Sequence, residues 1–352
     1  MMKTKQTNIL YIHNVKSSFV DKDMEILSAE FKVSSFYFDV YPKSKVFFSF
    51  IKQLIFLFSH LNSDVYVIQF GGFHSFLPVL LAKLLGKKSV IILGGTDCVS
   101  FPSINYGNFN RKLLGFFTKL SLKNASLLLP VDASLIKYKY EYQNNDFEFQ
   151  GYKNFIPSIQ TPVKVVYNGY DADKWNPQNI SKEAKSFVTI GANLNTRFGV
   201  KLKGIDLLFE VAKLQPECRF YIIGGKGLNI NSVPENIQLL DKIPNHELAN
   251  FLANKCFYVQ LSMSEGFPNA LCEAMLCGCI PIVSAVGAMP MIVGENGYIL
   301  QHKDISELNS IIENSLQIYN KEVISINCRK RIKDNFPLEK RQKELILALK
   351  EL

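Results

Sequence analysis

The chain has 352 residues, of which 47% are hydrophobic and 20% charged, an ordinary globular composition whose length fits two domains better than one. The net charge of +9 is scattered along the chain without a nucleic-acid-binding signature, so it favours an anionic membrane surface or a phosphate-bearing substrate over nucleic acid. With no apolar run of about 18 residues, no recognisable export signal and seven cysteines that lack zinc-site spacing, we expect a cytoplasmic protein with reduced cysteines.

Short apolar runs alternate with amphipathic stretches in the first half of the chain. The runs read as buried strands and lie at residues 8–12, 34–41, 64–70, 88–93 and 125–131. Helix-like segments lie between them, such as residues 76–87, where Gly86 marks a helix end. This alternation predicts βαβ units and a parallel sheet with helices on both faces.

Residues 43–61, KSKVFFSFIKQLIFLFSHL, are rich in Phe, Leu and Ile and carry Lys43, Lys45 and Lys52. One interpretation is a crossover helix buried against the first sheet. The other is a helix on a membrane surface, whose apolar side chains enter the headgroup boundary while its lysines meet anionic lipid. The sequence leaves both interpretations open.

A second, similar series begins near Ser186. Strand-like runs lie at residues 186–192, 219–225, 237–240, 257–262, 280–284 and 297–300, and helix-like runs at 204–215, 246–255, 269–278 and 305–319. The polar, turn-rich residues 165–185 separate the two series. We therefore expect domains at 1–168 and 169–335, joined near 168–186, followed by an amphipathic helix at 336–352 that could pack back on the first domain.

The segment SEGFPNALCEAM, residues 264–275, contains Glu265 and Glu273 with seven residues between them, where a loop after a strand turns into a helix. Ligands of open α/β sheets bind at such carboxyl ends of strands. With Asn269 as N-cap, the helix start offers free backbone N–H groups that suit phosphate or sugar oxygens. Glu265 would bind hydroxyl groups over the helix start, and Glu273 another part of the same ligand. A nucleotide sugar has both parts, a pyranose and a ribose, joined by a diphosphate.

The two glutamates also allow simpler interpretations. A glutamate in the first turn of a helix often serves only the helix dipole, and a loop glutamate can be solvated. A glycosidase pair of acid and nucleophile fits poorly, because neither carboxyl group is evidently buried or paired in a way that would tune its pKa.

Three segments resemble the retaining GT-B glycosyltransferases of family GT4. In chain order they are VVYNGYDADKW from residue 165, NLNTRFGVKLKGIDLLFEVAK from residue 193, and EGFPNALCE from residue 265 with the following AMLCGCIPIVSAVGAMPMIV. The resemblance covers roughly residues 165–300. It implies an α/β protein of the GT-B fold, with two Rossmann-like, doubly wound domains that face each other across a cleft.

The resemblance also implies roles for residues of the second domain. Arg197 and Lys203 would neutralise the diphosphate as the glycosidic bond breaks, so that neither a metal nor another cofactor is required, and Lys201 is a rival for Lys203. Glu265 would hold the hydroxyls of the donor sugar and Glu273 those of the ribose. The other donor-binding candidates are Gly266, Phe267, Asn269 and Ala270, then Gly225 and Ile243 around the base, and Asn168 of the interdomain segment.

The first half departs from the family pattern. Many members have a glycine-rich loop after the first strand, which this chain lacks, and a histidine after a later strand, where this chain has VIILGGTDCVSFP. In that stretch Gly94 and Gly95 let the backbone come close, and Asp97 is a catalytic candidate that would contact the acceptor or the donor sugar. His74 is the nearest substitute histidine on the acceptor side, although a lone histidine is more often structural.

We therefore expect retaining transfer of a sugar from a nucleotide sugar, with a UDP-sugar favoured, to a hydroxyl of a glycan or lipid-linked acceptor in cell-surface polysaccharide biosynthesis. The expected partners are that donor, that acceptor and an anionic membrane, at whose inner face the protein would work. Two alternatives keep the same donor pocket: a GT-B nucleotide-sugar epimerase and a non-catalytic nucleotide-sugar-binding scaffold.

Overall fold

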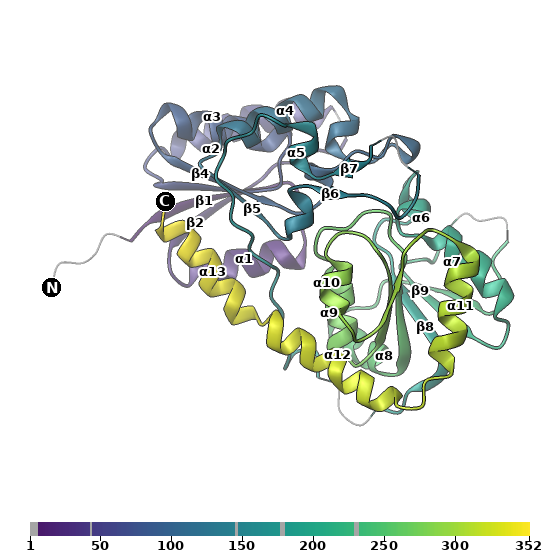
Figure 1. The fold of residues 1–352 in the computed structure, drawn as a ribbon. Coiled ribbons are helices and arrows are strands. Elements are labelled where there is room, and N and C mark those ends of the chain that lie inside the picture. Colours follow the sequence, from purple (N-terminus) through teal and green to yellow (C-terminus); the bar gives the residue numbers. More distant parts are fainter. Residues whose placement is uncertain (1–5, 43, 145–146, 177–179, 229–231) are drawn as a thin grey trace.

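The computed structural model describes residues 6–42, 44–144, 147–176, 180–228 and 232–352. Lys43, the first residue of the segment 43–61, lies outside the described residues. The chain forms two α/β domains, each built on a parallel sheet, and its last helix returns from the second domain to the first (Figure 1). The α/β class and the two doubly wound domains predicted from the sequence are confirmed.

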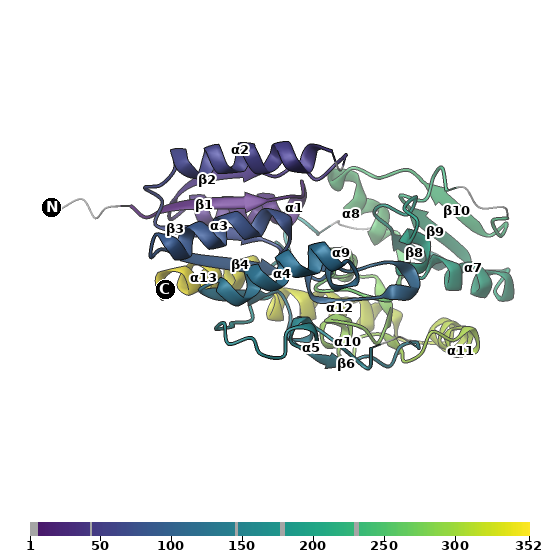
Figure 2. The same cartoon turned by 90° about the horizontal axis from the view of Figure 1, so that it is seen from above.

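The first domain is a five-stranded parallel sheet in the order β2-β1-β3-β4-β5. Its strands are β1 (Asn8–His13), β2 (Lys32–Tyr37), β3 (Val65–Gln69), β4 (Lys88–Leu93) and β5 (Leu127–Pro130). Its main helices are α1 (Ser18–Ser28), α2 (Lys45–Ser59), α3 (Phe73–Leu84) and α4 (Lys112–Asn124). Right-handed crossovers put α1 on one face of the sheet and the other three helices side by side on the opposite face (Figures 1 and 2).

Two details of this domain differ from the sequence prediction. The strand expected at 34–41 runs instead from Lys32 to Tyr37, and it is half exposed because β2 forms the edge of the sheet and pairs only with β1. Within the predicted segment 43–61, residues 45–59 form the crossover helix α2, but this helix is not buried as one interpretation required. Its buried residues are Ser49, Gln53 and Leu57, whereas most of its large apolar side chains are exposed.

A small subdomain follows β5 in the first half of the chain. It contains the two-stranded antiparallel sheet of β6 (Tyr138–Lys139) and β7 (Phe149–Gln150), then the short helix α5 (Tyr152–Phe155). The hydroxyl of Tyr142, just after β6, donates to the carbonyl of Leu261 in the second domain at 3.4 Å. The subdomain therefore contacts both halves of the molecule.

The second domain is a six-stranded parallel sheet in the order β10-β9-β8-β11-β12-β13. Its strands are β8 (Glu183–Ile190), β9 (Arg219–Ile223), β10 (Ile237–Leu240), β11 (Lys255–Gln260), β12 (Ile280–Ser284) and β13 (Tyr298–Leu300). Its helices are α6 (Gly199–Leu202), α7 (Ile205–Leu214), α8 (Asn245–Ala253), α9 (Asn269–Leu276), α10 (Met289–Val293) and α11 (Ile305–Leu316). The rings of Phe187, Phe220 and Phe257 stack on three adjacent strands and fill the centre of this domain.

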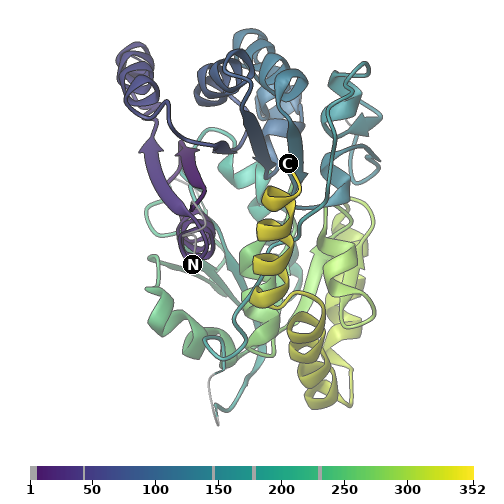
Figure 3. The same ribbon diagram turned by 90° about the vertical axis from the view of Figure 1, so that its left-hand side faces the viewer.

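Two final helices, α12 (Lys321–Asn335) and α13 (Leu338–Lys350), lead from the second domain back along the first (Figure 3). Arg341 of α13 forms a buried, bidentate ion pair with Asp23 of α1, with Nε–Oδ1 at 2.7 Å and Nη2–Oδ2 at 2.6 Å. The same guanidinium donates to the carbonyls of Val166 and Tyr167, at the connection between the domains. The C-terminal helix is therefore fixed both to the first domain and to the interdomain connection.

All seven cysteines are buried and free. Among the helices that the structure describes, none has the length and apolar character needed to cross a membrane.

Candidate active site

Glu265 lies on the loop after β11, at the carboxyl end of the second sheet, and its side chain is held by three groups. Its Oε1 accepts hydrogen bonds from Ser262 Oγ at 2.7 Å and Gln260 Nε2 at 2.9 Å, and pairs with Lys203 Nζ at 2.5 Å. Only 13% of this side chain and 23% of that of Lys203 is exposed. All three contacts converge on Oε1, and within the described residues Oε2 has no hydrogen-bond partner. The carboxylate is thus oriented by one oxygen while the other can bind a ligand hydroxyl.

The position of Lys203 depends on the glycine that follows it. Gly204 has a φ of 67° and is the N-cap of α7, and a Cβ there would lie 2.2 Å from the carbonyl oxygen of Leu261. The N–H of Met263 donates to the carbonyl of Leu202 at 2.8 Å, which fixes the α6–α7 junction against the loop after β11. Only glycine permits this close approach, so Gly204 brings Lys203 to Glu265.

The rival lysine and the predicted arginine lie elsewhere on the same segment. Lys201 is exposed on α6. Arg197 is exposed on the turn before α6, and its guanidinium makes no hydrogen bond or ion pair with any residue that the structure describes. Phe198 next to it packs on Tyr106 of the first domain, with ring centroids 5.4 Å apart. Arg197 therefore lies at the boundary between the domains, and its contact with a diphosphate stays a prediction.

The two domains touch at the glycines that the sequence analysis singled out. A Cβ on Gly266 would lie 2.2 Å from the carbonyl oxygen of Gly94, and a Cβ on Gly95 would lie 3.3 Å from the amide nitrogen of Gly266. These loops follow β4 and β11, so the carboxyl ends of the two sheets face each other. Glu265 is thus at the interdomain contact, where ligands of paired α/β domains bind.

Asp97 is buried, with 1% of the residue exposed, and accepts hydrogen bonds from backbone N–H groups. Oδ1 accepts from Gly94 at 3.2 Å and Gly95 at 3.0 Å, and Oδ2 accepts from Gly71 at 2.9 Å. Burial raises the pKa of this carboxyl group, and the backbone hydrogen bonds oppose that rise. In this structure Asp97 therefore shapes the Gly94–Gly95 loop from inside, and the direct sugar contact expected of it stays a prediction.

His74 is also buried, with 1% exposed, and its Nε2 lies 2.7 Å from the carbonyl oxygen of Gln69. Burial lowers the pKa of its imidazole to about 4, so the ring is neutral at physiological pH. The side chain thus lies in the interior of the first domain, and the acceptor-side role expected of His74 stays a prediction.

The start of α9 differs from the predicted cap. Pro268, with φ of −74°, is the N-cap, and Asn269 is the first helical residue. The side chain of Asn269 instead accepts from Tyr170 Oη at 2.7 Å and from Asn168 Nδ2 at 3.3 Å. Asn168 also donates to the carbonyl of Phe267 at 3.3 Å. The interdomain segment thus holds the loop, and the first N–H groups of α9 remain free of helical partners.

Other predicted donor-binding residues lie nearby. The ring of Phe267 is buried against Tyr170 and Phe336, so its contact with a donor stays a prediction. Gly225 and Ile243 follow β9 and β10, which neighbour each other in the sheet, and they are buried and half-buried, respectively. Ala270 is half-buried in the first turn of α9.

Glu273 lies one turn into α9 and faces the first domain. Burial raises the pKa of its carboxyl group, and the cations of Lys22 and Lys174 oppose that rise. Lys22, on α1, has its own pKa lowered by burial, and the charge of Glu273 opposes that effect. The Nζ of Lys22 lies over the ring of Tyr170, 4.9 Å from its centroid. Glu273 makes no hydrogen bond through its side chain to any described residue, so it remains able to accept one from a ligand.

Sequence reasoning missed four residues of this site: Gln260, Ser262, Lys22 and Tyr106. Gln260 is the last residue of β11 and Ser262 follows on the loop before Glu265, so their spacing alone could have indicated them. Tyr106 bonds to Thr96 Oγ1 through its hydroxyl at 2.8 Å, and its pKa is raised by burial and in part by the charge of Glu265. It comes from the other domain, as does Lys22, and only the tertiary structure brings these two to the site.

In the part of the chain that the structure describes, no group of three or more His, Cys, Asp or Glu side chains is placed to hold a metal ion.

The chain is similar to known proteins in sequence and in fold. The model of the family "Glycosyl transferases group 1" matches residues 196–336. A phosphatidylinositol N-acetylglucosaminyltransferase subunit from Arabidopsis thaliana is 25% identical over 173 residues, which cover 45% of this chain and 38% of that protein. N-acetyl-alpha-D-glucosaminyl L-malate synthase from Bacillus anthracis is 21% identical over 299 residues, 81% of this chain and 73% of that one. This chain thus spans well under half of the plant protein.

A solved structure matches the whole chain. Anabaena Alr3699/HepE in complex with UDP-glucose has a TM-score of 0.70 and 14% sequence identity, and the match covers 98% of this chain and 100% of that one. The class is therefore the GT-B fold of glycosyltransferases, as the resemblance implied. Within that class, the model of the group 1 glycosyl transferases matches the residues that carry Lys203, Glu265 and Glu273.

Proposed function

We propose that this chain is a retaining glycosyltransferase that moves a sugar from a nucleotide sugar to a hydroxyl group of a glycan or lipid-linked acceptor. One observation carries the proposal: Glu265 is oriented through Oε1 by Ser262, Gln260 and Lys203, while Oε2 is free of described partners, at the contact between the domains. A group held in one orientation before the ligand arrives needs little rearrangement in the transition state.

In the proposed reaction, the bond between the anomeric carbon and the diphosphate oxygen breaks, and its electron pair leaves with the diphosphate. The acceptor oxygen forms the new bond on the same face of the sugar, and its proton passes to the leaving phosphate oxygen. Lys203 and Arg197 stabilise the charge that grows on the diphosphate, together with the free N–H groups of α9. Glu265 holds the sugar hydroxyls, and no metal or cofactor takes part.

The donor that we favour is a UDP-sugar, because the HepE structure of the same fold was determined with UDP-glucose. A lipid-linked acceptor is favoured by the names of relatives, which include a phosphatidylinositol N-acetylglucosaminyltransferase and a transferase acting on a diphospho-undecaprenol glycan. We propose that the protein acts in the cytoplasm at the inner face of the membrane, in cell-surface polysaccharide biosynthesis.

The test begins with calorimetric titration of the protein with UDP, GDP and ADP in the presence of EDTA. We expect one nucleoside diphosphate to bind. The protein should then release this diphosphate from a matching nucleotide sugar, slowly when the sugar is transferred to water and faster when an acceptor is present. NMR of the product should show that the anomeric configuration is retained. Absence of binding by all three would overturn the donor site. Conversion of the nucleotide sugar without release of the diphosphate would indicate the epimerase, and binding without any turnover would indicate the scaffold.

A further inference from the structure

Helix α2 buries two of its polar residues and exposes most of its large apolar ones. The inward stripe contains Ser49 and Gln53, whose side chains donate to the carbonyls of Asp39 and His74, both at 2.8 Å. The outward stripe contains Phe47, Phe48, Ile55 and Phe58, which are 57–68% exposed. One buried and one part-buried hydrogen bond therefore fix the helix with its apolar face toward solvent, opposite to the usual arrangement of an amphipathic surface helix.

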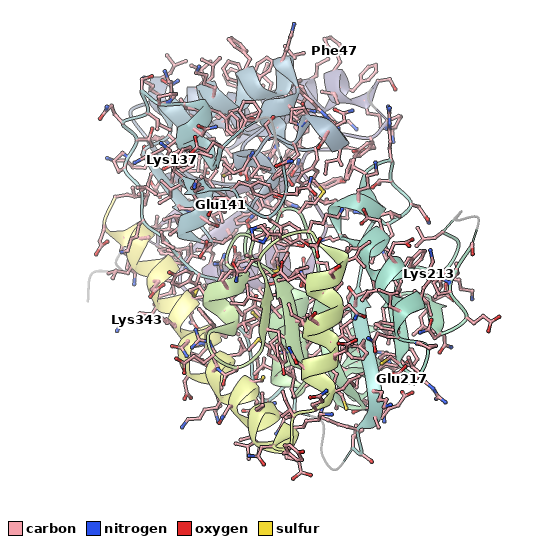
Figure 4. All side chains as sticks on the ribbon, turned by 45° about the vertical axis from the view of Figure 1, so that its right-hand side comes forward. Phe47, Lys137, Glu141, Lys213, Glu217 and Lys343 are labelled. Carbon is pink, nitrogen blue, oxygen red and sulfur yellow. The ribbon has the colours of Figure 1, made fainter. Side chains whose placement is uncertain are left out.

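The exposed apolar surface continues over the two neighbouring helices. Phe50 of α2, Phe73 of α3 and Phe117 of α4 contact one another with ring centroids 5.5–6.5 Å apart, so the three helices form one continuous layer. Figure 4 shows Phe47 projecting from the outside of this layer. We call the exposed apolar side chains of the layer the outer face; they are Phe47, Phe48, Ile51, Leu54, Ile55, Phe58, Leu80, Leu84, Leu113 and Phe116.

The charges on these helices all have one sign. Helices α2, α3 and α4 contain Lys45, Lys52, Lys83, Lys112, Lys119 and Lys123 and not a single aspartate or glutamate. All six lysines are exposed. Lys45 pairs with Asp39, which precedes α2, at 3.5 Å, and the other five ammonium groups have no carboxylate partner among the described residues. An apolar surface with lysines and no carboxylate on its three helices matches an interface of acyl chains below anionic headgroups, because lysine stems lie along apolar surface while their ammonium groups reach the phosphates.

We propose that the outer face is a monotopic docking surface for a lipid bilayer that contains anionic phospholipid. This inference deepens the membrane location in the proposed function by assigning the surface that binds the bilayer, and it does not depend on the donor site. It fits that function, because helices of a doubly wound sheet begin near the carboxyl ends of the strands. Phe47, Leu113 and Phe116 lie in the first turns of α2 and α4, so the end of the face nearest the active site would itself enter the bilayer, where a lipid-linked acceptor resides.

The test is co-sedimentation of the full chain with vesicles of phosphatidylcholine and phosphatidylglycerol, compared with vesicles of phosphatidylcholine alone. We expect binding to the mixed vesicles that weakens when salt is added, since exposed charges are screened. Phe48→Ser with Ile55→Ser should reduce binding roughly tenfold or more, because two apolar side chains no longer enter the headgroup region. Lys52→Glu with Lys119→Glu should reduce binding to mixed vesicles by a similar factor and should not affect the neutral ones.

Matched controls lie in the second domain and on α13. Leu214→Ser replaces an apolar side chain of α7 that is 55% exposed, and Lys343→Glu reverses a charge on α13, away from Phe47 (Figure 4). Both should leave vesicle binding unchanged. Equal binding by the wild type and the Phe48/Ile55 double variant would overturn the proposal. So would a concentration-dependent dimer that these substitutions abolish, because the occupant would then be a second copy of the chain.

Nucleoside diphosphate binding, measured on the same variants, separates this inference from the proposed function. Vesicle binding by a protein that binds no nucleoside diphosphate would support the docking surface and overturn the donor site. Binding of a nucleoside diphosphate without vesicle binding would support the donor site and overturn the docking surface.

Discussion

The two domains share a doubly wound sheet but use the polar groups at its carboxyl end in different ways. In the first domain Asp97 and His74 are 1% exposed, and both make their hydrogen bonds to backbone groups of their own domain. In the second domain Glu265 keeps one carboxylate oxygen free, and Glu273 makes no side-chain hydrogen bond, as far as the described residues extend. In the first domain these groups are thus already hydrogen-bonded internally, whereas those of the second domain can still accept a hydrogen bond from a ligand.

This difference explains why the same kind of sequence signal had different outcomes. A polar residue after a strand of either domain was a candidate for binding, because ligands bind at that edge of the sheet. What decides is whether backbone N–H groups or carbonyls of neighbouring loops already satisfy the side chain. Substitutions at the connection between the domains should therefore have the largest effect on stability, and substitutions within each domain should separate structure from ligand binding.

The buried pair between Arg341 and Asp23 joins α13 to the first domain, and its loss should have the largest effect on stability. Arg341→Met leaves the Asp23 carboxylate buried and unpaired, so we expect the free energy of unfolding of the first domain to fall by about 3–5 kcal/mol. Urea denaturation followed by circular dichroism measures this. Lys350→Met on the same helix breaks an ion pair with Glu30 in which both side chains are about half exposed, and it should change stability by less than about 1 kcal/mol.

The double variant Asp23→Leu with Arg341→Met controls for the source of this effect. It removes both charges and should recover much of the lost stability, because no unpaired charge remains buried. A double variant as unstable as Arg341→Met alone would show that the hydrogen bonds to Val166 and Tyr167, and not the ion pair, hold the helix.

Lys203→Ala tests whether the second domain stabilises the leaving group. We expect the rate of sugar transfer to fall about a hundred- to a thousand-fold, since a cation next to the developing charge is removed. Lys201→Ala, two residues earlier and exposed, should leave the rate close to that of the wild type. A reversed ranking, measured by release of nucleoside diphosphate, would make Lys201 the catalytic lysine.

Much of the fold could be predicted from the sequence because most strands carry uninterrupted apolar runs, as in β1, β3 and β4. The exceptions have physical causes. β2 is an edge strand with half-exposed residues, so its limits were misplaced. The sequence analysis named no element between residues 320 and 336, where α12 lies, because that helix buries little more than Cys328 and Ile332 and has no clear apolar stripe.

The site could be predicted only where its residues share one segment. Glu265, Gly266 and Glu273 lie on the loop and helix after one strand, and Lys203 is marked by its glycine. Lys22 and Tyr106 come from the other domain, and nothing in their local sequence separates them from other surface residues. The inward polar stripe of α2 was also hidden, because burial of Ser49 and Gln53 depends on carbonyls that only the tertiary structure brings near.

His74 gives the first domain a pH dependence that an exposed histidine would not. Its pKa is lowered by burial to about 4, against about 6.5 in an unfolded chain. Above pH 6.5 the lowered pKa has no cost to stability. As the pH falls from there toward 4, the imidazole is protonated in the unfolded chain but not in the folded one, so the free energy of unfolding decreases by about 3 kcal/mol in all. His74→Gln should make the urea midpoint less dependent on pH over that range. His246→Gln, at an exposed site on α8, should leave this pH dependence unchanged. Equal pH profiles for wild type and His74→Gln would mean that the imidazole is not buried in solution.

Glu273 should give the second domain the opposite pH dependence of stability. Its carboxylate is available to a ligand, and keeping it charged lowers the stability of the folded protein. Burial raises the pKa of Glu273 in the folded protein above its value in the unfolded chain. The protonated carboxyl group therefore favours folding at a pH below the unfolded pKa, and this contribution is lost as the pH rises through the folded pKa. At neutral pH, Glu273→Gln should therefore raise the melting temperature of the free protein. The same substitution should weaken binding of the nucleoside diphosphate by roughly ten- to a hundred-fold, since a hydrogen bond from ribose to a charged group is lost.

Calorimetry and thermal unfolding of one variant then test both halves of this argument. As the pH is lowered, the nucleotide affinity of the wild type should begin to fall at a higher pH than it would if Glu273 had the pKa of an ordinary glutamate. This pH dependence of the affinity should be absent from Glu273→Gln. Glu265→Gln is the matched control: it should spare nucleoside diphosphate affinity and reduce transfer, because Glu265 serves the sugar. If Glu273→Gln bound the nucleotide as tightly as the wild type while melting at a higher temperature, Glu273 would be a strained structural residue, and the contrast between the domains would rest on Glu265 alone.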